Sequence, residues 1–262
     1  MNPESAKNLE HAASSELTAL DVRLAELKAR YPEGIEAGII GYGAWLRNEL
    51  TYSSNAIEGN TLTDFETKLV LEEDAVIPGK TLREHNEVKG HAEAWDYAVS
   101  HLVEKNTLSA SDILELHRRI VAHSMPEEHR GTLRRQAVRV TGAPVVFPNW
   151  MRVPDQIDQL GVEIAAEDVD LHPVLRAAHA HLDLVSIHPF VDGNGRTARM
   201  LMNTMLLRSG FVAIPIYPAD RPTYLEAIRK AQIDGDDGAA FCDFIVTLES
   251  REIDQLLASD QS

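Results

Sequence analysis

Two helical patterns flank one short loop, and this arrangement limits the possible fold more than any other feature of the sequence. Residues 173–187 form an apolar run that ends where Pro189, Gly193 and Gly195 interrupt the pattern. Apolar residues return at helical spacing over 195–210. The loop therefore leads into the start of a helix, where free backbone N–H groups and the positive end of the helix dipole can bind an anion such as phosphate.

Helical patterns also cover most of the remaining chain, with one exception. Between residues 134 and 148, Val138 and Val140 alternate with polar residues before a Gly- and Pro-containing turn, which predicts a β-hairpin over 136–147. Its edge is either a plain surface hairpin or a site where an extended peptide adds as a strand. We therefore expect an all-α fold with a short β-hairpin, organised as a helical arm over 1–40 and a main domain over 41–262. Further helices are expected over 1–31, 45–57, from 63 onward, 82–103, 109–123, 154–167, 221–232 and 238–257.

The net charge of the chain argues against nucleic acid and anionic membranes as partners. Lysine and arginine number 25 against 41 acidic residues, a formal net charge of −16. Such a surface repels nucleic acid and anionic membranes, so neither is expected as a partner. The single cysteine, Cys242, lies in an apolar helical run and is expected to be a buried structural thiol. No run is apolar enough to span a membrane and no signal peptide is recognised, so we expect a soluble, cytoplasmic protein.

The loop contains two residues suited to moving a phosphoryl group. His188 has a side chain whose reference pKa lies near neutrality, so it can take the proton of an attacking hydroxyl, a step worth about 10²–10⁴ in rate. Asp192 supplies the hard oxygen ligand that Mg²⁺ prefers when the ion bridges two phosphates of a triphosphate. Together they indicate a base and a metal ligand at one phosphate site.

The helix start that follows supplies the anion-binding groups. Gly193 and Gly195 let phosphate oxygens approach the backbone without a Cβ in the way. Asn194 either hydrogen-bonds the phosphate or caps the helix. Arg196 and Arg199 are three residues apart, so they share a helix face and can bind successive phosphates.

Residues 188–199, HPFVDGNGRTAR, resemble the signature of Fic domain proteins at every defining position. The resemblance implies a mainly helical fold, the use of ATP with Mg²⁺, and transfer of AMP to a Ser, Thr or Tyr hydroxyl of a target protein. By the same likeness His188 is the general base, Asp192 the Mg²⁺ ligand, 193–195 the anion hole, and Arg196 and Arg199 phosphate binders. Doc toxins of the same family phosphorylate instead and carry lysine at the second glycine, so Gly195 favours adenylyl transfer.

The resemblance also assigns residues outside the motif. Fic proteins have a flap before the motif that aligns the target beside the histidine, so 136–147 is expected to be the docking site of the target protein. Tyr224 and Gln232 are the counterparts of adenine-binding residues, although asparagine is usual where Gln232 stands and a helical tyrosine more often packs in a core. His181 matches a position where a structural hydrogen bond is expected. Many Fic proteins self-associate, so a homo-oligomer agrees with the resemblance, but the sequence names no interface.

Upstream, residues 54–59 (SNAIEG) match the inhibitory motif of Fic proteins, which is Ser or Thr, three residues, Glu, then Gly or Asn. Its place before the catalytic segment resembles the class II subgroup, whose inhibitory helix, here near 45–59, is N-terminal. Glu58, together with Ser54, is then expected to hold Arg199 and keep it from the γ-phosphate. The sequence thus predicts a self-inhibited adenylyltransferase that can also modify itself. Two alternatives stay open: an enzyme that removes AMP from a modified protein, and a non-catalytic nucleotide-binding scaffold.

Overall fold

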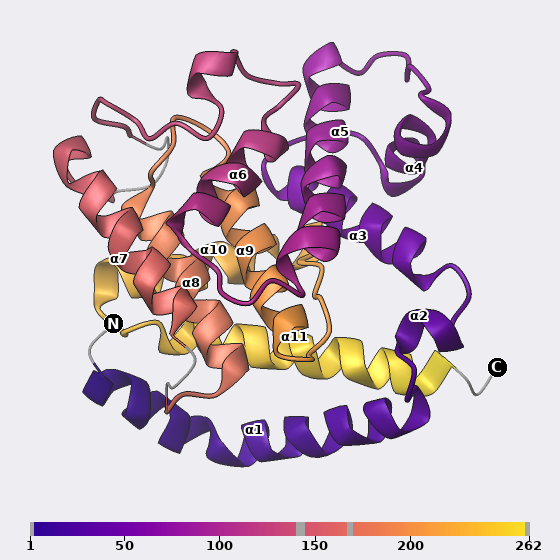
Figure 1. Cartoon of the computed structure of the whole chain (residues 1–262), viewed down its shortest axis with the longest axis vertical. Coiled ribbons are helices and arrows are strands. Elements are labelled where there is room, and N and C mark those ends of the chain that lie inside the picture. Colours follow the sequence, from indigo (N-terminus) through magenta and orange to yellow (C-terminus); the bar gives the residue numbers. More distant parts are fainter. Residues whose placement is uncertain (1–2, 140–144, 167–169, 260–262) are drawn as a thin grey trace.

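Helices are the only regular secondary structure in the part of the chain that the computed structural model describes, which comprises residues 3–139, 145–166 and 170–259, with side chains from residue 14 onward (Figure 1). No strand is assigned within those ranges. The all-α prediction is therefore confirmed. The helices are α1 (Pro3–Arg30), α2 (Ile35–Gly38), α3 (Tyr42–Ile57), α4 (Asp64–Glu73), α5 (Leu82–Tyr97), α6 (Ala110–Ile120), α7 (Val153–Ala165), α8 (Pro173–Ile187), α9 (Asn194–Arg208), α10 (Arg221–Arg229) and α11 (Ala239–Ala258), and π-helical turns continue α5 over Ala98–Leu102 and α10 over Lys230–Asp234.

The hairpin expected over 136–147 is not seen in the structure. Its turn, 140–144, lies outside the described residues, and the flanks 136–139 and 145–147 carry no strand assignment. The strand pairing of this segment stays a prediction.

Helices α8 and α9 form the centre of the molecule (Figure 1). Most residues of both helices are buried, so these two helices are covered by other elements on nearly all sides. Helices α6, α7 and α11 pack against this pair, while α3 and α5 approach α9. The loop from His188 to Gly193 joins the two central helices, so the buried centre of the fold positions the predicted catalytic residues.

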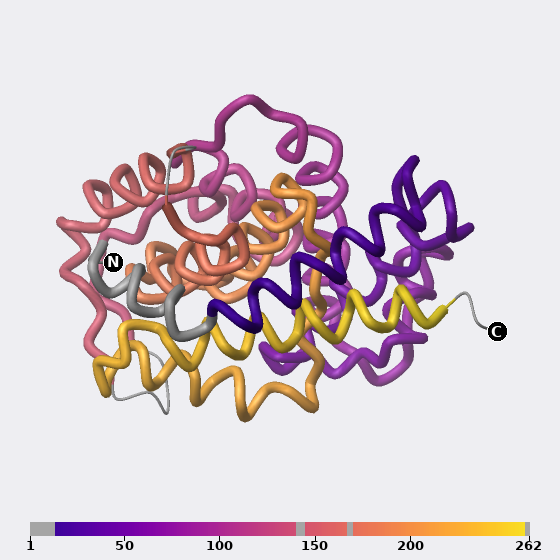
Figure 2. Tube along the Cα trace, turned by 90° about the horizontal axis from the view of Figure 1, so that it is seen from below, coloured from indigo at the N-terminus to yellow at the C-terminus, as the bar shows by residue number. Residues whose placement is uncertain are grey.

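Helix α1 lies along α11, and the two helices run in the same direction (Figure 2). Its leucines are buried, and they belong to the same hydrophobic core as the central helices. Arg23 pairs with Asp254 at 2.8 Å, while Arg30 donates to the Leu257 carbonyl. The arm over 1–40 thus packs onto the main domain, although its boundary at residue 40 stays a prediction. The buried leucines are Leu17, Leu20, Leu24 and Leu27.

Helices α3, α4 and α5 form a layer beside the central pair. Thr63 and Thr81 begin α4 and α5 with capping boxes, in which threonine and the glutamate three residues later each bond the other's backbone N–H. A small second core lies between α4 and α5. Helix α3 ends at Ile57, and Gly59 takes the left-handed φ of 96° that such an end requires, as its sequence predicts. The residues of the second core are Leu62, Val70, Ile77 and Val88.

Two smaller expectations can be judged from the described residues. Cys242 is buried as expected, and burial raises the pKa of its thiol to about 12, which makes it unreactive. None of the described helices is both long and apolar enough to cross a bilayer.

Candidate active site

The loop before α9 is fixed by hydrogen bonds between its own residues. His188 ends α8 with a left-handed φ of 50°, and its backbone N–H donates to the Leu184 carbonyl at 2.9 Å. The side chain of Asn194 receives the Phe190 N–H at 2.9 Å and donates back to the Phe190 carbonyl at 3.0 Å. The Asn194 side chain is therefore used by the loop itself, and only its backbone remains for a phosphate.

Gly193 is required by both conformation and space. Its φ is 82°, a value that side chains rarely adopt, and an added Cβ would lie 3.0 Å from Val121 and 3.3 Å from the His117 ring. His117 comes from α6. Its Nε2 donates to the Asp192 carbonyl at 3.0 Å, its Nδ1 accepts from the Gly131 N–H at 2.9 Å, and its ring stacks on Phe190 at 3.6 Å. Helix α6 therefore stabilises the loop through the contacts of His117 with Asp192 and Phe190.

His188 faces the cavity beside the aromatic ring of Phe147. The two ring centroids are 4.1 Å apart. Burial lowers the pKa of His188 to about 4, although a hydrogen bond to the Val185 backbone works in the opposite direction. The imidazole is thus neutral at pH 7, with one nitrogen bonded to the backbone and the other left to accept a proton.

Asp192 is held by two arginines. Its Oδ2 receives Arg83 Nη2 from α5 at 2.7 Å, and its Oδ1 receives the Gly193 N–H at 2.7 Å and Arg196 Nη2 at 3.3 Å. Burial alone would raise the pKa of Asp192, but Arg196, the Gly193 N–H and Arg83 hold it below the usual value. Asp192 is accordingly a carboxylate, as a metal ligand must be.

A divalent cation fits beside Asp192 only together with a phosphorylated ligand. The described residues contain no group of three His, Cys, Asp or Glu side chains placed to hold a metal. Mg²⁺ commonly binds to one or two carboxylates and takes its other ligands from substrate phosphates and water. The Asp192 side chain is 41% exposed and suits that role.

Arg196 is buried with unused hydrogen-bond donors. It is 2% exposed, and neither its Nε nor its Nη1 has a hydrogen-bond partner among the described residues. Glu87 approaches its Nη1 only to 3.6 Å. Because unpaired buried donors are costly, this geometry favours an anion at the start of α9.

Arg199 is bound by the predicted inhibitory segment. It is 3% exposed and donates to Ser54 Oγ at 3.0 Å, to the Ser54 carbonyl at 2.9 Å and to Glu58 Oε1 at 2.8 Å. Helix α3 thus presents both sequence-predicted inhibitory residues to Arg199. Within the described residues Glu58 is the only carboxylate paired with it.

Glu58 lies directly over Gly195. A Cβ added at Gly195 would stand 2.4 Å from Glu58 Oε1 and 3.1 Å from Arg199 Nη1. The carboxylate therefore occupies the space above the glycine that was expected to receive phosphate. A side chain at position 195 would require the Glu58 carboxylate to move.

The residues expected to bind adenine have different surroundings. Tyr224 is 2% exposed, accepts a hydrogen bond from Arg199 Nη1 at 3.0 Å, and lies 2.9 Å from His181 Nε2. The hydrogen bond between the Tyr224 hydroxyl and His181 Nε2 is the structural bond expected for that histidine. Gln232 Nε2 donates to Ser186 Oγ at 3.2 Å and lines the cavity. Tyr224 supports Arg199 rather than offering an open ring face.

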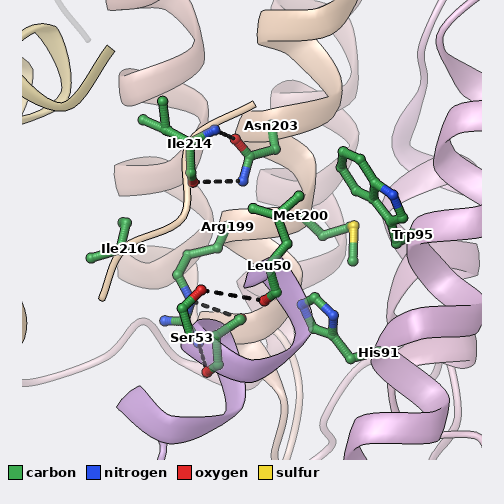
Figure 3. A pocket seen from close by; sticks show the side chains of 10 residues that line it. Leu50, Ser53, His91, Trp95, Arg199, Met200, Asn203, Ile214 and Ile216 are labelled. Carbon is green, nitrogen blue, oxygen red and sulfur yellow. Dashed lines mark hydrogen bonds between the residues drawn. The ribbon is translucent and has the colours of Figure 1, made fainter. Parts of the chain in front are cut away.

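One cavity of about 580 Å³ brings most of these groups together, a volume within the range of small-molecule sites. Glu58, His188, Gly195 and Arg199 line one part of it. At the other end Leu225 and Ile233 from α10 and the turn after it are each about 40% exposed. A separate void of about 10 Å³ lies behind Arg199, between α3, α5 and α9 (Figure 3). It is close to the smallest space that holds one water.

Three supporting residues were not predicted from the sequence. Arg83 and His117 contact Asp192 from α5 and α6, and Arg134 bonds the backbone beside His188. All three are distant from the motif in sequence. Their bonds to the loop depend on how distant helices pack, so no local signal in the sequence could have identified them.

Comparisons with known proteins agree with this geometry. The Fic/DOC family model matches residues 107–206. The "Protein adenylyltransferase Fic" of Nematostella vectensis is 40% identical over 210 residues, which cover 79% of this chain and 48% of that protein. A relative of the same name from Drosophila willistoni is 41% identical over 208 residues, 79% of this chain and 41% of that protein. The chain thus spans less than half the length of these curated relatives.

Solved structures show the same similarity over nearly the whole chain. Fic-1 from C. elegans superposes with a TM-score of 0.86 at 29% identity, covering 97% of this chain and 74% of that one. A Fic domain containing signaling protein from Bacteroides thetaiotaomicron has a TM-score of 0.78 at 26% identity, covering 93% and 96%. With the motif, the helical fold and these relatives in agreement, the chain contains a domain of the Fic/DOC family, which the family model matches over residues 107–206.

Proposed function

We propose that this chain is a protein adenylyltransferase that transfers AMP from ATP to a protein hydroxyl and is held inactive by Glu58. The observation that carries the proposal is the 2.8 Å ion pair between Glu58 and Arg199 inside the cavity that also contains His188. The curated relatives named as adenylyltransferases support the same reaction.

His188 and the start of α9 have separate roles in the proposed reaction. A target Ser, Thr or Tyr hydroxyl attacks the α-phosphorus of ATP, a new O–P bond forms, and the bond between the α- and β-phosphates breaks to release pyrophosphate. The hydroxyl proton passes to His188, whose neutral imidazole is ready to accept it at pH 7. The backbone at 193–195 and the unused donors of Arg196 hold the phosphates in place.

Asp192 would hold Mg²⁺, and the ion would neutralise negative charge that develops on the leaving pyrophosphate. In the structure both oxygens of Asp192 are bonded to other groups of the chain. Arg83 and Arg196 therefore keep this carboxylate ionised and oriented toward the loop.

Inhibition follows from competition for one guanidinium. Arg199 is the residue expected to bind the γ-phosphate, and Ser54, Glu58 and Tyr224 already take its donors. Glu58 also fills the space over Gly195. ATP would have to displace the carboxylate or bind with its α-phosphate misaligned, and alignment supplies much of the rate in phosphoryl transfer.

The ends of the cavity fit adenine and a target protein. Leu225 and Ile233 provide apolar surface for a base, with the Gln232 amide beside them. On the other side Val146 is 94% exposed next to Phe147, which covers His188. We place the target along 136–147, so that its hydroxyl meets His188.

The reaction class can be tested with ATP labelled at either the α- or the γ-phosphate. Glu58→Gly protein with Mg²⁺ and a cell lysate should transfer the α-label to itself or to a lysate protein, and His188→Ala added to it should abolish that transfer. Transfer of the γ-label alone would mean phosphorylation. Transfer of neither label, with ATP still bound, would leave only a nucleotide-binding scaffold.

One observation favours a second activity of the same site. The Glu58 side chain is 42% exposed to the cavity, so its free oxygen can orient a water toward a bound phosphodiester. Wild-type protein added to an AMP-modified target would then release AMP, whereas Glu58→Gln protein would not. Absence of release from both proteins excludes this activity.

A further inference from the structure

Arg134 is a buried arginine outside the motif that holds the backbone on both sides of His188. Its side chain is 2% exposed. Its Nε donates to the His188 carbonyl at 2.8 Å and its Nη2 approaches the Ile187 carbonyl at 3.4 Å, while its backbone N–H donates to the Pro189 carbonyl at 2.8 Å. Three consecutive residues around the base are thus bonded to one arginine.

The same guanidinium also reaches both ends of the segment that precedes α7. Its Nη1 donates to the Gln136 carbonyl at 3.0 Å, and its Nη2 donates to the Pro148 carbonyl at 2.7 Å. We call Gln136 and Pro148 the flap bases, because the flap segment 137–147 begins and ends at them. The Arg134 side chain therefore bonds both flap bases and also the backbone of His188.

This arrangement is unusual in charge and in backbone conformation. Burial lowers the pKa of Arg134, and every hydrogen-bond partner of its side chain among the described residues is a carbonyl rather than a carboxylate. His188 has a φ of 50°, which a residue with a side chain keeps only where its surroundings enforce it. The Leu184 carbonyl accepts its N–H and Arg134 binds its carbonyl, so both polar backbone groups of His188 are fixed.

We propose that Arg134 is a positioning residue for AMP transfer, which fixes the distance between the docked target and the His188 base. The inference rests on the proposed function, because it assumes that the target binds along the flap segment. Phe147 lies one residue before a flap base and packs on the His188 ring, so the bonds of Arg134 set that contact as well. Lysine cannot take its place, because one ammonium group cannot reach carbonyls that a planar fork bonds in several directions.

The test compares Arg134→Lys with a matched control, Arg135→Met, both in Glu58→Gly protein. Arg135 is the exposed neighbour of Arg134. ATP affinity is measured by calorimetry, and transfer is measured as α-label incorporated into lysate protein. We expect Arg134→Lys to lower transfer about 100-fold, the effect of misplacing a reacting group by about 1 Å, with ATP affinity changed less than about threefold. The control should change neither quantity.

Two results would overturn the proposal. One is transfer by folded Arg134→Lys protein within about threefold of its parent. The other is a loss of ATP affinity equal to the loss of transfer, which would mark a general structural defect. If Glu58→Gly protein itself transfers no label, the proposed function fails, and the Arg134 geometry is then judged by the next measurement alone.

That measurement uses the unmutated chain and does not depend on the folding of a variant. In protein labelled with ¹⁵N-arginine, the Nε proton of Arg134 should exchange with solvent at least about tenfold more slowly than that of Arg135, because it is buried and bonded to His188. Equal exchange rates would show that the bond to His188 does not persist in solution and would refute the inference.

Discussion

Replacement of Glu58 by glutamine tests how much of the inhibition comes from charge alone. The glutamine oxygen can still accept the bond from Arg199 Nη2, so the shape of the pair is kept while its charge is removed. A hydrogen bond to a charged group contributes about 1.5–3 kcal/mol, and because the Glu58 side chain is 42% exposed we use a smaller value, about 1–2 kcal/mol. Loss of this energy should strengthen ATP binding by about 5–30-fold.

The assay is calorimetry of Mg²⁺-ATP binding, with His188→Ala in every protein so that no chemistry occurs. Glu73→Gln is the matched control, since Glu73 is an exposed carboxylate at the end of α4. ATP affinity within about twofold for the Glu58 and Glu73 variants would refute the competition between Glu58 and phosphate.

Three further predictions follow from pKa shifts and ion pairs. Because burial lowers the pKa of His188 to about 4, the base form persists down to that pH, and transfer by Glu58→Gly protein should fall only near pH 4; initial rates half lost near pH 6.5 would contradict this. Arg83→Gln removes the guanidinium at 2.7 Å that keeps Asp192 ionised and oriented, and should weaken Mn²⁺-ATP binding about two- to fivefold by electron paramagnetic resonance, whereas unchanged binding would contradict that role of Arg83. Burial raises the pKa of Glu249 in the folded protein to about 8, whereas its ordinary value is 4.5. The unfolded chain therefore loses this proton first, and the folded protein loses stability as the pH rises from 4.5 to about 8. Glu249→Gln should then raise the free energy of unfolding in urea at pH 9 by a few kcal/mol, up to about 5, and no gain relative to pH 5 would refute the assignment.

The part of the site that is contiguous in sequence could be predicted, because local patterns determine it. Pro189 and Gly193 show where α8 ends and α9 begins, and the motif residues between them therefore had to meet at one helix start. Glu58 was expected on other grounds, because residues 54–59 resemble the inhibitory motif of Fic proteins; in the structure it follows the last residue of α3.

The remaining contacts depend on how distant helices pack. The helical pattern of 221–232 does not fix which side of Tyr224 faces the core, and the structure directs its hydroxyl to Arg199. Arg83 and Arg134 have no motif of their own, because Asp192 and His188, the loop residues that they bond, lie 109 and 54 residues away. For the predicted hairpin, alternation of Val138 and Val140 indicates an extended chain but does not supply a partner strand.

The most direct test of a transferase inhibited by its own glutamate is the initial rate of α-label incorporation from ATP in three proteins: wild type, Glu58→Gly, and Glu58→Gly with His188→Ala. Release of Arg199 should raise the Glu58→Gly rate at least about tenfold above wild type, and removal of the base should lower it again by about 10²–10⁴. Equal incorporation in all three proteins would contradict both the inhibitory role of Glu58 and the catalytic role of His188.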